Sequence, residues 1–401
     1  MLTRRFFLRG SAVALAGAGT APMWLCRAAA ATQTRRKVLV AIFQRGAADG
    51  LNIVAPFGDK RYSELRPTIG LPTPARAAGQ GNGTLDLDGY FALHPSLQPL
   101  KELWDRKTLA VIHAAGSPDP SRSHFDAQDF MESGTPGAKR DGWLNRALPA
   151  PGPDTSPLRA VSLGATLPRT LQGERSAIAV ADLQQFRMQD SSASLIESMY
   201  ESSSDPQLAH AGKDAFAAMR MLKSISRPNG PNGYQQGGEL GRSLQQIAAL
   251  IKADVGVEAA FAEIGGWDHH QNEPGQIGNV LRQFGSALAA FSKDMGDRME
   301  DVVVVTMSEF GRTARENGNS GTDHGHGGAM FVLGGPVCGG KVYGKWPGLE
   351  DEQLYEKRDL AVTTDFRAVL SELVTAQLGG SDMANVFPGY HPGEPLGIVR
   401  S

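Results

Sequence analysis

Five segments of the chain combine acidic, imidazole and hydroxyl side chains with glycine, and each lies next to a short apolar run. The segments are Arg45–Asn52, Ser121–His124, Gly265–Asn272, Ser308–Arg312 and Gly321–Gly327. Carboxylate oxygens together with imidazole nitrogens suit a borderline cation such as Zn²⁺, Mn²⁺ or Fe²⁺, whereas an all-oxygen set suits Ca²⁺ or Mg²⁺. Five of the nine histidines fall in these segments. The residue types therefore predict a divalent-metal site, provided that the segments meet.

The apolar runs beside these segments are typical of buried strands, because they are continuous, rich in β-branched residues and bounded by glycine or polar turns. They are Lys37–Phe43, Thr108–His113, Val257–Ile264, Asp301–Met307 and Ala329–Leu333. Apolar residues at helical spacing predict helices over Leu240–Ala253 and Gln276–Met295, and a third helix that Thr364 caps and Gly379 ends. Strands that alternate with helices predict an α/β fold, a mainly parallel sheet with helices on both faces.

One edge of such a sheet is the expected place for the site, because the carboxyl ends of parallel strands lie along it and ligands bind there. The candidate metal ligands are Asp49, Asp268, His270, Glu309, Asp323, His324 and His326. Two of them have an ordinary structural alternative. Asp49 can cap the turn that follows it, and Glu309 can form an ion pair with Arg312.

Ser123 opens a predicted helix that runs through Met131 and ends near Gly134. Serine is favoured as the residue that caps a helix, and a cap is one role for it. The other role is a nucleophile that a metal activates, with the amino end of the helix holding an anionic substrate. Both roles place Ser123 at the same point. Its neighbour Arg122 is a candidate to clasp a phosphate or sulfate group by paired hydrogen bonds.

Taken together, these motifs resemble the domain of unknown function 1501 family of exported bacterial proteins. That family is grouped with alkaline phosphatases, sulfatases and cofactor-independent phosphoglycerate mutases. The resemblance implies an alkaline-phosphatase-like fold that holds one or two divalent ions, zinc or manganese, at the carboxyl edge of the sheet. It implies that Ser123 is the nucleophile and that Asp268 and His270 form one metal pair. It also puts Asp49 in the place of the first-strand ligand and Glu309 in the place of a usual aspartate.

The sequence departs from these relatives at two points. Pro118 stands where common sulfatases carry the cysteine that becomes formylglycine, so a sulfatase of that kind is not expected. Phosphatases have an Asp-His pair after the fourth strand, and Glu309 is followed by Phe310 instead. Either the later Asp323-His324 pair folds back to replace it, or the second metal is weak or absent. His324 or His326 resembles the late histidine that precedes a strand.

The first 31 residues have the pattern of a twin-arginine signal peptide: the Arg4-Arg5 pair, a short apolar run and a cluster of small residues at Ala28–Ala31. The alternative, a retained anchor, needs a longer apolar run than this to span a bilayer. We therefore expect the twin-arginine translocase as a partner during export, no stable membrane anchor, and a periplasmic or secreted protein. Residues 32–401 are expected to form a single domain with insertions near 57–90 and 136–238.

Composition limits the function classes. The formal net charge of -2 gives no electrostatic reason to expect nucleic acid as a partner. The two cysteines do not form a haem or iron–sulfur pattern, which disfavours a redox protein. The sequence thus predicts a metal-dependent hydrolase that acts on a small anionic phosphate or sulfate ester. The alternative is a non-catalytic periplasmic binding or assembly protein that retains the fold.

Overall fold

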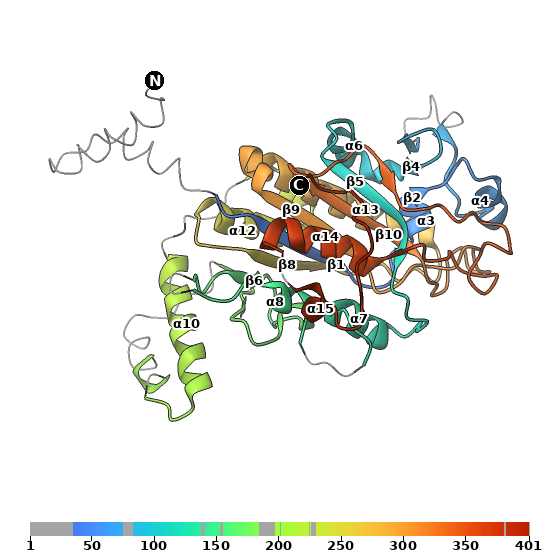
Figure 1. Ribbon diagram of the computed structural model, residues 1–401. Coiled ribbons are helices and arrows are strands. Elements are labelled where there is room, and N and C mark those ends of the chain that lie inside the picture. The colour runs from blue at the N-terminus through green and yellow to red at the C-terminus, as the bar shows by residue number, and fades with distance from the viewer. Residues whose placement is uncertain are drawn as a thin grey trace, which may run out of the picture. The chain divides into compact units, whose positions relative to one another are not determined.

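The computed structural model describes residues 35–74, 83–137, 141–152, 155–183, 197–200, 202–223, 225, 230–380 and 382–400. The predicted signal peptide, residues 1–31, lies outside them. Residues Lys37–Ser401 make up one unit, shown in Figure 1. None of the helices in the described ranges combines the length and the apolar character needed to cross a membrane.

A mixed sheet organises this unit. In the described residues it has nine strands in the order β11-β5-β10-β9-β1-β8-β6-β7, and β12 also pairs with β5. The strands are β1 (Val38–Gln44), β5 (Leu109–Gly116), β6 (Ala160–Ser162), β7 (Ile178–Ala179), β8 (Ala259–Ile264), β9 (Val302–Met307), β10 (Gly328–Gly334), β11 (Val342–Tyr343) and β12 (Thr364–Asp365). All five predicted strands are present, as β1, β5, β8, β9 and β10.

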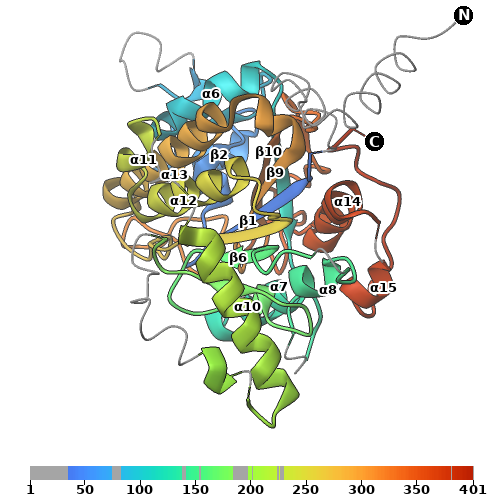
Figure 2. The same ribbon diagram turned by 90° about the vertical axis from the view of Figure 1, so that its left-hand side faces the viewer.

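The central strand β1 explains why the sheet is covered on both faces. All seven of its residues are buried. Successive side chains of a strand point to opposite faces, so Val40 enters one hydrophobic cluster and Ala41 the other. Figure 2 shows α12 and α13 on one side of β1 and β9, and α14 on the other. The predicted α/β class, a mainly parallel sheet with helices on both faces, is confirmed.

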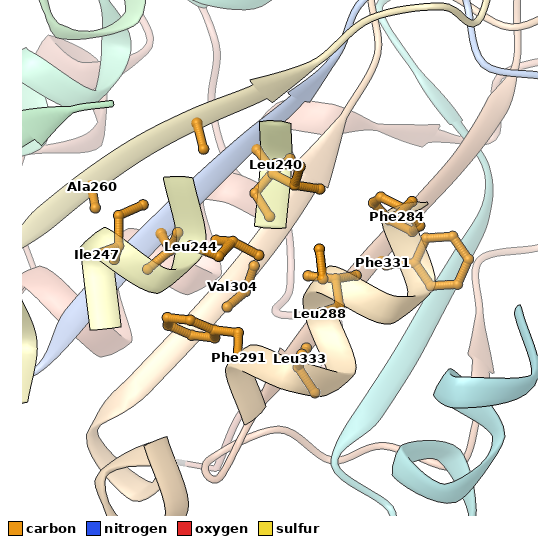
Figure 3. Close-up of a cluster of buried hydrophobic side chains, with 14 of the residues drawn as sticks. Leu240, Leu244, Ile247, Ala260, Phe284, Leu288, Phe291, Val304, Phe331 and Leu333 are labelled. Atoms are coloured by element: carbon orange, nitrogen blue, oxygen red, sulfur yellow. The ribbon is translucent and has the colours of Figure 1, made fainter. Parts of the chain in front are cut away.

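Helices α12 (Gly238–Lys252) and α13 (Glu273–Met295) lie over one face through stripes of apolar side chains (Figure 3). The residues recur every three or four positions, which puts them on one side of each helix. The stripes and the strand residues beneath them are Leu240, Leu244, Ile247, Phe284, Leu288, Phe291, Val304, Phe331 and Leu333. Burying each of these large side chains stabilises the fold by about 1.5–3 kcal/mol. Both helices begin a few residues before the predicted starts.

The other face is covered by α14 (Phe366–Leu378), together with α7 (His124–Ser133) and α8 (Trp143–Ala147). Helix α14 ends as predicted at Gly379, whose φ of 87° suits glycine. The predicted cap was wrong by one residue. Thr364 belongs to β12, and the side chain of Asp365 accepts the hydrogen bond from the Arg367 amide.

Strand β10 brings the loop before it to the same edge as the loops that follow the other strands. It runs antiparallel to both β5 and β9, whereas β1 runs parallel to β8 and β9. Its amino end therefore lies beside the carboxyl ends of its neighbours. This is why Gly321–Gly327, which precedes a strand, can meet Gly265–Asn272 and Ser308–Arg312, which follow strands.

The two stretches expected as insertions carry secondary structure. Residues 57–90 include α4 (Lys60–Leu65) and β3 (Leu85–Asp86), which belongs to a small sheet of order β2-β4-β3. Residues 136–238 include α8, β6 and β7, so this stretch also extends the main sheet beyond β8. The remaining elements are α3 (Gly50–Ile53), β2 (Val54–Ala55), β4 (Ala92–Leu93), η1 (Pro95–Leu97), α6 (Gln98–Asp105), η2 (Arg169–Leu171), α10 (Pro206–Lys223), α11 (Gly233–Gln236), η3 (Gly296–Asp301) and α15 (Met383–Val386).

Candidate metal centre

Three imidazole rings surround the carboxylate of Asp268, which lies in the loop after β8. Asp268 Oδ1 is 3.1 Å from Nε2 of His270 and 3.3 Å from Nε2 of His324. Asp268 Oδ2 is 3.5 Å from Nε2 of His124. The Nε2 atoms of His270 and His324 are 3.0 Å apart. Side chains from α7, from the loop after β8 and from the loop before β10 thus meet at one point.

The other ring nitrogen, Nδ1, of each histidine contacts an oxygen that can only accept a hydrogen bond. The partners are Glu309 Oε1 for His124 (2.8 Å), Asp323 Oδ1 for His270 (3.1 Å) and the backbone carbonyl of Arg122 for His324 (2.8 Å). Each Nδ1 must therefore carry the ring proton, and in a neutral ring this leaves a lone pair on Nε2. The three lone pairs converge on the Asp268 carboxylate.

Such an arrangement fits a cation. Without one, three lone pairs and a carboxylate would face one another with no proton between them. Imidazole rings whose Nδ1–H is held by a carboxylate or a carbonyl are typical of metal ligands. His124, Asp268 and His324 each offer a ligand atom within 4.8 Å of one another, so this group could hold a metal ion. Between 23% and 45% of these side chains is exposed, which leaves the centre open to ions from solution.

The buried Arg312 guanidinium also binds the Asp268 carboxylate. Its Nη1 donates to Asp268 Oδ1 at 2.8 Å, while Nε and Nη2 bind the hydroxyl and carbonyl of Thr322. Burial works to raise the pKa of Asp268, but the hydrogen bond and the positive charge of Arg312 bring it below its usual value. Asp268 is therefore ionised. Arg312 pairs with this residue, and the ion pair predicted as an alternative for Glu309 does not form.

Residues 36–386 match the family described as "Protein of unknown function (DUF1501)". The chain belongs to this family. The family resemblance seen in the motifs is thereby confirmed.

Solved structures similar to this DUF1501 chain include two distant ones. One is a protein in the alkaline phosphatase superfamily from Vibrio parahaemolyticus, with 10% identity, a TM-score of 0.31 and coverage of 75% of this chain and 61% of that one. The other is the PH0037 protein from Pyrococcus horikoshii, with 12% identity, a TM-score of 0.25 and coverage of 75% and 86%. No curated protein matches. The DUF1501 chain spans about three fifths of the length of the Vibrio protein.

Glu309 lies behind His124, outside the group of converging atoms. Its fully buried carboxylate accepts hydrogen bonds from the Gly46 amide (2.8 Å), from Gln128 Nε2 (2.9 Å) and from His124. Burial opposes ionisation, but the bond from Gln128 and those from its own amide, His124 and Gly46 bring the pKa of Glu309 below its usual value. An ionised Glu309 orients His124. Asp323 has the same relation to His270, on a more exposed part of the surface.

We expect Glu309→Gln to weaken binding of zinc about 10- to 100-fold, because residues that hold a ligating histidine have effects of this size. The glutamine side chain fills the same buried space, but it lacks the negative charge that Glu309 places beside Nδ1 of His124. Competition with a chromophoric chelator measures the affinity. Glu263→Gln, which removes an exposed carboxylate that contacts Arg45, is the matched control. Equal affinities in the two variants would contradict the orienting role.

The structure places Asp49 in a buried ion pair, apart from the three histidines. Its Oδ2 is 2.6 Å from Nη1 of Arg66, and Oδ1 accepts from the Leu51 amide at 3.1 Å, which is the capping role. Burial raises the pKa of Asp49, but the charge and hydrogen bonds of Arg66 outweigh it and the net shift is downward. Asp49 is therefore ionised and neutralised by Arg66.

A second buried acid, Glu273 at the start of α13, lies beside this pair. Asn52 donates to Glu273 Oε1 at 2.8 Å, and Thr322 donates to Oε2 at 3.2 Å. Burial, followed by the nearby charge of Asp49, raises the pKa of Glu273 well above its usual value. Of the two neighbouring acids, Asp49 is therefore ionised and Glu273 is protonated. Because Thr322 also accepts from Arg312, and Arg312 binds Asp268, this network connects the buried acids to the candidate metal centre.

A protonated Glu273 makes the stability of the fold depend on pH. A carboxyl whose pKa is raised by folding stabilises the folded state below its unfolded pKa of about 4.3 and loses that contribution as the pH rises. Glu273→Gln keeps the neutral form at all pH values. We measure the free energy of unfolding of both proteins with urea. As the pH rises from 4.5 to 7, we expect the value for Glu273→Gln to increase relative to that of the unaltered protein. The exposed Glu352→Gln serves as the control. A constant difference would contradict the protonated state.

Three other predicted residues lie near the centre without joining it. The Arg122 guanidinium binds Asp359 at 2.7 Å and Glu356 at 2.7 Å. His326 is buried and stacked on Tyr355, with ring centroids 4.4 Å apart. Ser123 takes the N-cap position of α7 but makes no capping hydrogen bond through its side chain.

Two residues in and around this centre, His124 and Arg66, are not among the predicted site residues. His124 was recognised as one histidine among five, but it was not placed among the ligands. The available signal was its spacing from Gln128, since residues four apart share one face of a helix and both contact Glu309. Arg66 follows a short helix in a loop-rich stretch, and nothing in the spacing indicates that it pairs with Asp49.

Proposed function

We propose that this protein is an exported, metal-dependent hydrolase of phosphate or sulfate esters. The observation that supports it most is the convergence of three imidazole Nε2 atoms on the Asp268 carboxylate, each imidazole being held through Nδ1. The Arg4-Arg5 signal motif supports export by the twin-arginine translocase to the periplasm or the outside of the cell.

The donor set favours zinc or manganese, because three nitrogens and one carboxylate oxygen suit a borderline cation. Within the described residues, His124, Asp268 and His324 form a group that could hold an ion, and His270 Nε2 lies 3.0 Å from His324 Nε2. We therefore propose a single ion held by these four residues. Bound there, a divalent cation would polarise the ester and lower the pKa of the attacking hydroxyl or water.

Ser123 is the proposed nucleophile. It directly precedes His124, and its hydroxyl is not used to cap α7. The amino end of this ten-residue helix adds a favourable potential for an anionic group. Arg122 acts through its backbone, because its carbonyl holds Nδ1 of His324 while its guanidinium is already paired with two carboxylates.

Elemental analysis of the purified protein, followed by a screen of phosphomonoesters, phosphodiesters and sulfate esters, tests this function. We expect about one zinc or manganese per chain and turnover that chelation abolishes. Ser123→Ala should lower kcat by at least ~100-fold, the scale on which removal of a catalytic group acts. Turnover that survives the substitution would assign the attack to water. A protein that takes up no metal would contradict the proposal.

A second candidate is a non-catalytic periplasmic binding or assembly protein. It is favoured by the state of Arg122, the residue expected to hold the ester anion, since Asp359 and Glu356 occupy its guanidinium. The same screen separates the two functions. Stoichiometric metal without turnover of any ester class would support the binding protein.

A further inference from the structure

A cavity of about 240 Å³ adjoins the metal centre. Its wall includes Asp323 and Asn317. Asp323 Oδ1 accepts from Nδ1 of His270 at 3.1 Å, and Asn317 donates to both Asp323 and the backbone of His270. One hydrogen bond and one imidazole ring therefore separate the cavity from the converging Nε2 atoms.

The acidic side chains around this cavity are already engaged. The Glu316 carboxylate accepts from the backbone amides of Thr68 and Ile69, at 2.9 Å and 3.0 Å. Asp351 pairs with Arg61 at 3.0 Å, and Asp323 holds His270. Each of these carboxylates therefore has a hydrogen-bond or ion-pair partner, and the charge of Arg358 also acts on Asp323.

The basic side chains are not compensated in the same way. Arg315 and Lys357 both line the cavity, are exposed, and form no hydrogen bond or ion pair through their side chains within the described ranges. Arg358, the third cation, donates to the carbonyl of His324 at 3.0 Å and contacts Asp359 at 3.3 Å. The cavity therefore offers an anion two unpaired cations.

The turn that carries one of these cations is strained. Glu356 and Lys357 have φ values of 54° and 56°, a backbone conformation that residues other than glycine rarely adopt. The bridge between Tyr355 and Asp359 closes the turn. The strained conformation places Glu356 against Arg122 and Lys357 at the cavity. Strain of this kind persists where the surrounding structure requires it, and it often accompanies binding sites.

We propose that this cavity binds a second anionic group of the substrate. The substrate class is then an ester whose organic part carries its own phosphate or carboxylate, with the ester group at the metal centre and the other group between Arg315 and Lys357. This inference rests on the proposed hydrolase function for the identity of the ligand. The two unpaired cations at the cavity, Arg315 and Lys357, stand independently of it.

Binding of inorganic phosphate to the metal-free protein, measured by titration calorimetry at low ionic strength, tests the cavity by itself. We expect Arg315→Gln and Lys357→Gln each to weaken binding about tenfold, since each removes a charged hydrogen-bond donor. Lys345→Gln removes another exposed cation, which does not line the cavity, and should have no effect. Phosphate binding that is equal in all these proteins would overturn the inference.

Lys357→Gly distinguishes the loss of a contact with phosphate from a loss of folded protein. Glycine adopts a positive φ without strain, so we expect this variant to melt at the same or a higher temperature while binding phosphate as weakly as Lys357→Gln. Loss of binding in a protein that is at least as stable supports a direct contact. Unchanged binding in the glycine variant would count against Lys357 as a ligand.

Kinetics of the metal-loaded protein separates the cavity from the reaction. For propane-1,3-diyl bisphosphate we expect the Arg315→Gln/Lys357→Gln variant to raise KM about 100-fold, and for propyl phosphate to leave KM unchanged. An equal effect on both esters would overturn the second-group assignment while hydrolysis stands. If no ester is hydrolysed but phosphate binding still depends on Arg315 and Lys357, the hydrolase function falls and the anion site remains.

Discussion

Zinc is expected to bind the His324→Ala variant about 100-fold more weakly than it binds the unaltered protein. Four-ligand zinc sites bind with about 10–16 kcal/mol, so one ligand accounts for roughly 3 kcal/mol, or two orders of magnitude. Burial holds the pKa of His324 below its ordinary value, which keeps this ligand unprotonated at neutral pH. Competition with a chromophoric chelator at pH 7 measures the difference.

His326→Ala is the matched control for this prediction. His326 lies two positions further along the same loop, but its ring stacks on Tyr355 and it does not belong to the converging group. We expect His326→Ala to keep the affinity for zinc while the protein becomes less stable, since a buried ring is lost. Equal losses of affinity in the two variants would show that the loop, and not the individual ligand, determines binding.

Arg66→Ala is expected to lower the free energy of unfolding by about 3–5 kcal/mol, because it leaves the buried Asp49 carboxylate without its counter-charge. The Arg66 side chain has 0% exposure and also donates to the carbonyls of Thr313 and Ala314, at 2.8 Å and 3.0 Å. Urea unfolding at pH 7, where Asp49 is ionised, measures the loss.

The nearby Arg61, which lies in α4, provides the comparison. It pairs with three exposed carboxylates, those of Glu64, Glu350 and Asp351, and its own side chain is accessible to solvent. Because exposed ion pairs contribute little, Arg61→Ala should change the unfolding free energy far less than Arg66→Ala. Comparable losses in the two variants would contradict the view that burial gives the Asp49 pair its importance.

The sheet could be predicted from sequence because its strands are buried on both faces. A run such as Val302–Met307 is buried at every position and apolar at all but Thr306, and this leaves a nearly continuous β-branched signal in the chain. The end of each run then indicates which polar residues reach the ligand-binding edge. That reasoning was sufficient to select Asp268, His270 and His324, which the structure brings together.

The roles within the site could not be predicted in the same way. Asp49 and Glu309 both follow strands, yet one pairs with Arg66 and the other holds His124. Which of these contacts forms depends on side-chain conformations and on packing between segments far apart in the chain. Spacing along the sequence carries information on local periodicity, and it does not record such contacts.

Apart from the neighbouring pair Asp268 and His270, the ligands of the candidate centre come from parts of the chain that are remote from one another. His270 and His324 are 54 positions apart, and His124 is 185 positions from the Glu309 carboxylate that orients it. An unfolded chain therefore offers a cation the Asp268–His270 pair but not the four ligands together, and uptake through all four has to follow assembly of the whole sheet. The amount of metal retained after gel filtration would accordingly count the correctly folded molecules in a preparation.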